Sequence, residues 1–283
     1  MRRIRDVVVI IAASLVIIHL ISPVILSGAL LLFRLGNSYV SDVENWVESW
    51  QHYLVGGDPG TLLYAASFDG GGTDGFNGDW QQYPGRLSAQ IAGGQMTISV
   101  GEANGGAYSY AAPHFGDFDL RVEAQAVSGP VDNGYGVIFR LQNKDNANDQ
   151  DDSYYLFLIS SDGYYRISRV VDGDEKILSD WIDSTAIQQG LNAVNRLRVV
   201  ARGDQFHFYV NDQPLQVCIP DDPNGVSTYS GGACVKGTMQ GALIDDTIPN
   251  GQIGVSALWT ADANEQPVVA AFDTLLVYAP PAS

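Results

Sequence analysis

The sequence is poor in basic residues. Its 283 residues include 15 Lys and Arg against 32 Asp and Glu, which gives a formal net charge of −17. Residues 1–34 contain four of the basic residues but only one acidic residue, so the rest of the chain is even more acidic. An acidic surface repels the phosphates of nucleic acids and anionic lipid headgroups. This excludes a nucleic acid partner and is compatible with divalent cations or neutral ligands.

Histidine and cysteine are also rare. The four histidines, at positions 19, 52, 114 and 207, are scattered, and no Ser/His/Asp arrangement can be inferred from them. The two cysteines, Cys218 and Cys234, lack nearby histidines, which argues against a metal site. They lie in a segment rich in Gly, Pro and Asp, and we expect a disulfide between them on the oxidising side of a membrane. Closing this loop contributes roughly 3 kcal/mol in the chain-entropy model.

The scarcity of methionine separates this composition from that of a helical protein. There are 3 Met against 31 Gly and 14 Tyr, which is typical of strands and turns. Hydrophobic residues make up 46% of the chain, enough for a large core. Since β-sandwiches often exceed 200 residues without dividing, we predict one large domain.

Charged residues are absent from residues 7–33. Of these 27 positions, 18 are Val, Ile, Leu or Phe, which at roughly −0.4 kcal/mol each favours membrane insertion by about 7 kcal/mol. A cleaved signal peptide is the alternative, but apolar sequence continues past the small residues at 27–29. Three Arg precede the span and one follows it. This distribution predicts a single-pass protein of the cell membrane with a cytoplasmic N-terminus and an extracytoplasmic domain.

A short amphipathic helix is predicted after the span. Ser41 and Glu44 have capping-box spacing, and apolar residues then recur every three or four positions. Its aromatic residues suit either the membrane surface or a partner helix, in a homo-oligomer or in a larger membrane complex. These residues are Trp46, Trp50 and Tyr53. The predicted divisions are a cytoplasmic tail at 1–6, the span at 7–33, the juxtamembrane helix and linker at 34–60, the main domain at 61–279 and a tail at 280–283.

In the main domain the period of the pattern becomes two. Apolar and charged residues alternate strictly in residues 118–123, as in a half-buried strand. Turn formers such as Asp172-Gly173 and Asn211-Asp212 separate the apolar runs at hairpin spacing. These features predict an all-β, antiparallel sandwich. Its predicted strands are 118–123, 135–141, 154–159, 164–171, 176–181, 195–201, 205–210, 253–259 and 268–277.

Several phrases in these strands carry a family resemblance. They are DFDLRVEA (117–124), NGYGVIFRLQN (133–143), YYLFLISSDGYYRISRVVDG (154–173), NRLRVVARGDQFHFYVNDQPL (195–215), GQIGVSALW (251–259) and VVAAFDTLLVY (268–278). In this order they resemble the concanavalin A-like lectin/glucanase superfamily, and more closely its laminin-G-like and 3-keto-disaccharide-hydrolase-type jelly-roll domains. The resemblance implies two curved antiparallel sheets with the first and last strands adjacent.

Glucanases of this superfamily carry their two catalytic carboxylates in a Glu-x-Asp-x-Glu pattern on one strand. The sequence lacks this pattern. Asp117, Asp119 and Glu123 share one strand face, which a solvated outer face explains equally well. We therefore assign no catalytic residues and favour a protein that is not an enzyme. A glycan-active hydrolase with an atypical site is an alternative.

Calcium (Ca²⁺) is the cofactor that the sequence suggests. Residues 144–153 concentrate carboxylate and amide oxygens in one loop, and Ca²⁺ takes six to eight such ligands. A solvated acidic loop is the alternative. The resemblance also implies a weaker second site at Asp69 and Asp273, where the first and last strands meet. The predicted ligands of the first site are Asp145, Asn146, Asn148, Asp149, Asp151 and Asp152.

Aromatic side chains are the candidate ligand contacts, because flat rings stack on sugars while polar neighbours bind their hydroxyls. The predicted residues are Trp80, Tyr83, Tyr135, Tyr164, Trp181 and Trp259, and each of them can instead fill the core. Together these features predict a membrane-anchored, extracytoplasmic lectin-like module that binds carbohydrate or another extracellular ligand. An accessory or structural subunit of a membrane complex is the alternative.

Overall fold

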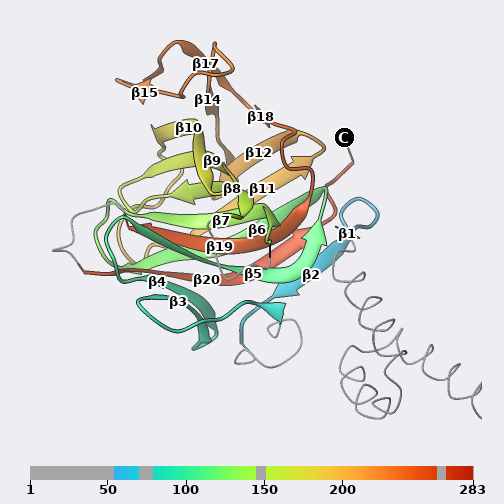
Figure 1. Ribbon diagram of the computed structural model, residues 1–283, viewed down its shortest axis with the longest axis vertical. Helices are drawn as coiled ribbons and strands as arrows, with labels where there is room; N and C mark the ends of the chain where they lie inside the picture. The colour runs from blue at the N-terminus through green and yellow to red at the C-terminus, as the bar shows by residue number, and fades with distance from the viewer. Residues whose placement is uncertain (1–53, 70–78, 145–150, 260–265, 283) are drawn as a thin grey trace, which may run out of the picture. The chain divides into compact units, whose positions relative to one another are not determined.

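The structure, a computed structural model, describes residues 54–69, 79–144, 151–259 and 266–282 (Figure 1). These ranges contain strands and no helix that could cross a membrane. The predicted anchor and the Trp46/Trp50/Tyr53 helix lie outside the described residues. The strands are β1 (Leu54–Val55), β2 (Leu62–Ala66), β3 (Leu87–Ala92), β4 (Gln95–Val100), β5 (Gly105–Phe115), β6 (Phe118–Ser128), β7 (Gly134–Gln142), β8 (Ser153–Ile159), β9 (Tyr164–Val171), β10 (Asp174–Asp183), β11 (Asn195–Arg202), β12 (Gln205–Val210), β13 (Gln213–Pro214), β14 (Val217–Pro220), β15 (Tyr229–Ser230), β16 (Ala233–Cys234), β17 (Gly237–Gln240), β18 (Leu243–Ile244), β19 (Gly251–Trp259) and β20 (Val268–Tyr278).

Two large sheets form the sandwich (Figure 1). The seven-stranded sheet has the order β1-β5-β19-β7-β8-β9-β10. The nine-stranded sheet has the order β13-β12-β11-β6-β20-β4-β3, with β18 beside β12 and β2 beside β20. All pairs except β1–β5 are antiparallel, and β2 near the start of the sandwich pairs with the last strand. The predicted all-β, jelly-roll-like sandwich is therefore confirmed.

The core between the sheets is rich in aromatic rings. On β7, Phe139 packs in this core, whereas its neighbour Ile138 belongs to a separate cluster on the opposite face. Phe139 stacks on Tyr155 of β8 with ring centroids 5.3 Å apart. Phe206 of β12, in the other sheet, lies 4.9 Å from the Tyr155 ring. Such pairs add about 0.5–1.5 kcal/mol each beyond area burial, so they help to hold the two sheets together.

The predicted turn formers make tight hairpins. Asp172 and Gly173 have φ values of 51° and 84°, and Asn211 and Asp212 have values of 50° and 65°. Positive φ at both central positions is the geometry of a type I′ turn, which matches the twist of the flanking strands. Asp172-Gly173 joins β9 to β10.

A buried arginine ties three loops together at one end of the sandwich. Arg140, at the end of β7, is 1% exposed. Its guanidinium donates hydrogen bonds to the carbonyl oxygens of Ile248 (2.9 Å), Gly203 (2.6 Å) and Gly116 (3.2 Å). It also lies over the ring of Phe206, 4.7 Å from the centroid. Burial lowers the pKa of Arg140, and the three carbonyl dipoles together with the Asp117 carboxylate, whose Oδ1 lies 3.9 Å from the guanidinium, offset the cost of burying the charge.

A second charged group is buried on the outer face of the nine-stranded sheet. Asp119 is 1% exposed and accepts paired hydrogen bonds from Arg121 and Arg198, the shortest at 2.7 Å. The two guanidinium groups lie over the rings of Tyr278 and Tyr209, at 5.0 and 4.9 Å from the centroids. Burial alone would raise the pKa of Asp119, but these hydrogen bonds hold it below its usual range.

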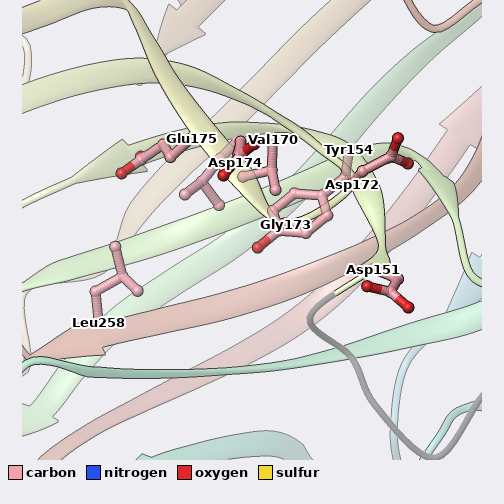
Figure 2. A pocket seen from close by; sticks show the side chains of 9 residues that line it. Asp151, Tyr154, Val170, Asp172, Gly173, Asp174, Glu175 and Leu258 are labelled. Carbon is pink, nitrogen blue, oxygen red and sulfur yellow. The ribbon is translucent and has the colours of Figure 1, made fainter.

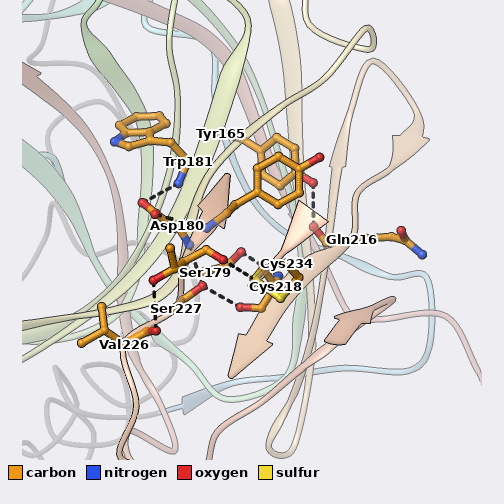
Figure 3. Close-up of a disulfide and its surroundings, with 11 residues drawn as sticks. Tyr165, Ser179, Asp180, Trp181, Gln216, Cys218, Val226, Ser227 and Cys234 are labelled. Atoms are coloured by element: carbon orange, nitrogen blue, oxygen red, sulfur yellow. Dashed lines mark hydrogen bonds between the residues drawn. A yellow bond between two sulfur atoms is a disulfide. The ribbon is translucent and has the colours of Figure 1, made fainter. Parts of the chain in front are cut away.

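The predicted disulfide between Cys218 and Cys234 is confirmed (Figure 3). It closes a segment that is also hydrogen-bonded to β10. The Cys218 N–H donates to Ser179 Oγ (3.0 Å), and the Asp180 N–H donates to Ser227 Oγ (3.0 Å). Ser227 Oγ in turn donates to the Cys218 carbonyl (2.7 Å). The segment is therefore attached to the edge of the seven-stranded sheet.

The sequence pattern did not predict β2, β3, β4 and β5, and one boundary also differs from the prediction. Leu54 and Val55 form β1, which pairs with His114 and Phe115 of β5. The sequence had placed this position in the juxtamembrane helix and linker, with the sandwich beginning at residue 61. Leu54 continues the helical spacing of the preceding segment, so the local pattern could not show that the free edge of β5 binds it as a strand.

Candidate functional site

The outer face of the seven-stranded sheet carries an apolar cluster that is separate from the core. Ile138 and Leu141 on β7, with Leu156 and Leu158 on β8, are at most 4% exposed. Sheet faces that are turned to water normally carry polar side chains, so a contiguous apolar group on such a face has to be covered, and here larger side chains cover it. The larger side chains that pack around the cluster are Tyr108, Tyr110, Tyr154, Trp181 and Leu258.

A hollow of about 580 Å³ opens beside this cluster. Figure 2 shows the ring of Tyr154 in its centre, with Leu258 to one side and Asp151 to the other. The hollow has a volume within the range of roughly 300–1,000 Å³ that is usual for small-ligand sites. Its lining consists of Asp151, Tyr154, Leu156, Val170, Asp172, Gly173, Asp174, Glu175 and Leu258.

The aromatic side of the hollow is held by a buried carboxylate. The Tyr108 ring lies 5.6 Å from that of Tyr154 and 6.3 Å from that of Tyr110. The Tyr108 hydroxyl donates to Asp152 Oδ2 (2.6 Å), and the Lys144 N–H donates to Asp152 Oδ1 (3.2 Å). Asp152 is 1% exposed, so it serves to fix the tyrosine cluster on β5 to the start of β8.

The tip of the β9–β10 hairpin forms the acidic rim. Its Gly173 N–H donates to the Asp152 carbonyl (3.1 Å), and its Asp172 N–H donates to Ser153 Oγ (2.9 Å). The Lys144 ammonium lies 2.5 Å from Asp172 Oδ1. This hydrogen bond lowers the pKa of Asp172 and raises that of Lys144. The rim is therefore fixed to the start of β8 by hydrogen bonds from the main chain of the hairpin tip.

Strands β9 and β10 add further polar groups to this face. Arg166 forms an ion pair with Glu175 of the rim. Ser168 is the register partner of Leu156 and precedes Val170 by two residues, so strand alternation places it on the face that lines the hollow. Among the described residues, neither Ser168 Oγ nor Arg166 Nε has a hydrogen-bond partner, although both atoms are buried. Such atoms cost stability unless a ligand or water pairs with them.

Three of the predicted ligand-binding aromatics are corrected by the structure. Trp80, Tyr135 and Trp259 are at most 4% exposed and belong to the core between the sheets. Tyr135 and Trp259 occupy inward positions of β7 and β19, and the Trp80 indole donates to the hydroxyl of Tyr64 (2.9 Å). Their rings offer no face to a ligand.

The other three predicted aromatics are at least partly accessible. Trp181 packs on the outer apolar cluster, with the guanidinium of Arg166 5.5 Å from its ring centroid. Tyr164 is 40% exposed at the start of β9. The Tyr83 hydroxyl donates to the Tyr108 carbonyl (2.8 Å), which places Tyr83 behind the tyrosine cluster. None of the three lines the hollow itself.

The sequence analysis missed Tyr108, Tyr154, Leu156 and Leu258. A signal was present in SYYLFLI (153–159), where every position except Ser153 is apolar or aromatic. A strand covered on one face alternates, whereas a continuous apolar run indicates that both faces are covered. This run therefore marks the strand whose outer face is apolar.

The calcium prediction stays a prediction. Four of its six principal ligands, at 145–149, lie outside the described residues. Of the other two, Asp152 is buried and hydrogen-bonded, while Asp151 is at the hollow. Asp69 lies beside Gly94 in the β3–β4 turn, and Asp273 accepts a hydrogen bond from the Thr274 N–H. Within the described ranges, no three His, Cys, Asp or Glu side chains are grouped to hold a metal ion.

Comparison with known proteins agrees with this architecture. The model of the 3-keto-alpha-glucoside-1,2-lyase-like domain family matches residues 64–258. No protein with curated annotation matches the chain.

Two solved structures show the same fold at low identity, and a third is similar over most of its own length. A protein of unknown function with a galectin-like fold from Bacillus subtilis is 11% identical, covering 78% of this chain and 97% of its own, with a TM-score of 0.51. The catalytic domain of an endo-1,3-beta-glucanase (laminarinase) from Thermotoga petrophila is 12% identical, covering 79% and 99%, with a TM-score of 0.50. The carbohydrate-binding module CBM66 from Bacillus subtilis is 15% identical, covering 71% and 95%, with a TM-score of 0.48.

Proposed function

Because the chain belongs to the family of 3-keto-alpha-glucoside-1,2-lyase-like domains, we propose that it is a saccharide-binding module with its site in the hollow of the seven-stranded sheet. The observation that carries this proposal is the apolar cluster on a sheet face that is turned away from the core. A hollow lined by a tyrosine, two leucines and a rim of carboxylates lies directly beside it.

The two kinds of lining residue match the two kinds of surface on a sugar ring. The C–H faces of a pyranose pack on aromatic and aliphatic side chains, here Tyr154, Leu156 and Leu258. The hydroxyl groups require hydrogen-bond acceptors, which Asp174 and Glu175 supply at the rim. A few polar groups around an apolar floor are the usual composition of a small-ligand site.

A binding titration tests the proposal. The purified full-length chain is screened against a glycan array, and the affinity of the best saccharide is measured by calorimetry. Tyr154→Ala should weaken binding about tenfold, since loss of a ring contact costs about 1–1.5 kcal/mol. Tyr209→Ala, on the outer face of the other sheet, is the matched control and should change the affinity less than twofold. Equal effects of the two variants, or no saccharide bound, would refute the proposed function.

The family also supports a second candidate, lyase action on a 3-keto-glucoside. Elimination next to a ketone needs a base whose pKa lies near the working pH. At the rim, the hydrogen bond from Lys144 moves the pKa of Asp172 in the opposite direction. Asp172 is therefore unsuited to be this base, and Glu175 is the rim carboxylate to test. Incubating the protein with a 3-keto-glucoside and following loss of the glycosidic bond by chromatography separates the two functions, because turnover that Glu175→Gln abolishes would establish the lyase.

We further propose that residues 7–33 tether the module to the outer side of the cell membrane. The uncharged span, its flanking arginines and a disulfide suited to an oxidising compartment support this location. Protease added to intact cells should degrade the domain, and only detergent should extract the chain. Native purification with identification of co-purifying chains tests the alternative of a membrane-complex subunit.

A further inference from the structure

The hollow extends along the strands of the seven-stranded sheet. Tyr154, near the start of β8, and Leu258, near the end of β19, both line it (Figure 2). Leu258 is the register partner of Gly134 on β7, and the next residue, Tyr135, pairs with Ile159 of β8. Leu258 is therefore level with the position after Ile159, six residues from Tyr154. At the rise of a strand this separation is about 15–20 Å, so the hollow is a groove rather than a round pocket.

Two glycines give Leu258 room at the far end of this groove. Gly106 of β5 and Gly134 of β7 are its register partners on either side. A Cβ at Gly106 would lie 2.5 Å from Leu258 Cδ2, so the leucine side chain occupies the space above this glycine. A Cβ at Gly134 would lie 3.3 Å from Leu258 Cβ and from Leu158 Cδ1. Leu258 thus lies against β5 and leaves the groove open toward β8.

The exposure of Gly106 is a second observation that points to a ligand. This residue lies within β5 and is exposed, so neither a turn nor dense packing requires a glycine there. Glycine weakens the interior of a strand, and it often marks a place where a ligand or another backbone approaches closely. Here it keeps the half-buried Leu258 low on the sheet, which leaves space above the leucine.

We propose that the groove binds a straight oligosaccharide chain along β8, with one sugar ring on Tyr154 and another on Leu258. This inference rests on the proposed function and adds the class of the ligand, which is a chain of several β-1,4-linked rings and not a single or branched sugar. Equatorial linkages at both ends of each ring keep such a chain extended. Leu156, two residues from Tyr154 on the same strand face, gives the ring between them an apolar floor.

The dependence of affinity on chain length is the first measurement. Calorimetry on the full-length protein compares β-1,4-linked glucose dimers, tetramers and hexamers. The dimer reaches only one of the two contacts, whereas the tetramer spans both. We expect the tetramer to bind about tenfold more tightly than the dimer, because it adds a ring contact. The hexamer should bind less than twofold more tightly than the tetramer, because the groove ends at Leu258.

Variants at the far end test the placement of the chain. Gly106→Ala pushes the end of the Leu258 side chain into the groove, and Leu258→Ala removes its contact. Each should weaken tetramer binding at least threefold more than dimer binding, whereas Tyr154→Ala should weaken both ligands. Gly241→Ala is the matched control, because a Cβ at this exposed glycine meets nothing within 4 Å, and it should change neither affinity.

The fold of the variants is checked by thermal melts. Gly106→Ala displaces only the end of a flexible side chain, so we expect it to fold. If it does not, Leu258→Ala decides the question, because shortening a half-buried leucine adds no clash.

The outcomes separate this inference from the proposed function. Equal affinities for dimer, tetramer and hexamer, or binding of single-ring or branched array glycans in place of the tetramer, would overturn the straight chain and leave saccharide binding standing. Equal losses for dimer and tetramer in the far-end variants would overturn the placement on Leu258. No binding of any oligomer or array glycan would overturn both proposals.

Discussion

Arg140 offers the sharpest test of how this sandwich is held together. Its guanidinium is the donor for three carbonyl oxygens from three separate connections, and the side chain is 1% exposed. Arg140→Met keeps the length and the apolar stem of the side chain but removes all three donors. The carbonyls of Ile248, Gly203 and Gly116 then lose their partners, and the contact with the Phe206 ring loses its charge.

The expected cost follows from the burial of each bond. The bond to Ile248 is fully buried, and an acceptor left unpaired there costs about 2 kcal/mol. The other two bonds are partly buried, so water can replace the donor and each costs about 0.5–1 kcal/mol. We therefore expect Arg140→Met to lower the free energy of unfolding by about 3 kcal/mol. For a domain of this size the melting temperature should fall by roughly 6–12 °C.

Urea denaturation of the purified chain, followed by tryptophan fluorescence, measures this loss because Trp80 and Trp259 are buried in the same core. Arg196→Met is the matched control. Arg196 is exposed, and its side chain pairs among the described residues with exposed Asp212, so its loss should cost less than about 1 kcal/mol. If Arg140→Met costs no more than this control, the reasoning that Arg140 ties the loops together is refuted.

Three other measurements address the disulfide, the buried carboxylate and the tyrosine cluster. Replacing Cys218 and Cys234 together by Ser should lower the free energy of unfolding by about 3 kcal/mol through the entropy of the unfolded chain, and a loss below 1 kcal/mol in a denaturant titration would contradict this. Because the pKa of Asp119 is lowered in the folded chain, its stabilising contribution is present above its unfolded pKa of about 3.9 and is lost as pH falls through the folded value. Thermal melts should therefore show stability falling below about pH 4, more steeply than in Asp119→Asn. Tyr108→Phe removes the hydroxyl donor to Asp152, and we expect a loss of about 1–2 kcal/mol together with weaker saccharide binding. Normal affinity in that variant would show that the cluster does not depend on this bond.

The sequence was sufficient for the fold class and for nine of the strands, β6 to β12, β19 and β20, because these show local patterns. Period-two alternation predicted β6, and Asp172-Gly173 and Asn211-Asp212 predicted the turns that fix hairpin register. The disulfide followed from two cysteines in a turn-rich segment. β1 was missed because its two residues become a strand only through the distant edge of β5. Local sequence cannot encode such a pairing.

The candidate site was harder to predict, because a strand pattern does not say which face is turned to the core. Tyr135 and Tyr154 look alike in sequence, yet the first is completely buried and the second lines the hollow. The difference arises from register. Sheet pairing places odd-numbered positions of β7 opposite odd-numbered positions of β8 on the core face, so Tyr135 points inward and Tyr154 points outward. The buried position of Asp152 could not be predicted, because a carboxylate in an acidic loop is expected to be solvent-exposed. Only the structure shows that the Tyr108 hydroxyl binds it.

The placement of the site on the seven-stranded sheet follows from how the two outer faces use their aromatic rings. On the nine-stranded sheet, Tyr209 and Tyr278 each lie under a guanidinium that is bound to Asp119, so the rings are already engaged by the protein's own charges. On the seven-stranded sheet, Trp181 is covered by Arg166 in the same way. Tyr154 instead lines an open hollow with apolar neighbours. A ligand that needs an aromatic surface can therefore bind in this hollow. We expect saccharide affinity to depend on Tyr154 and not on Trp181.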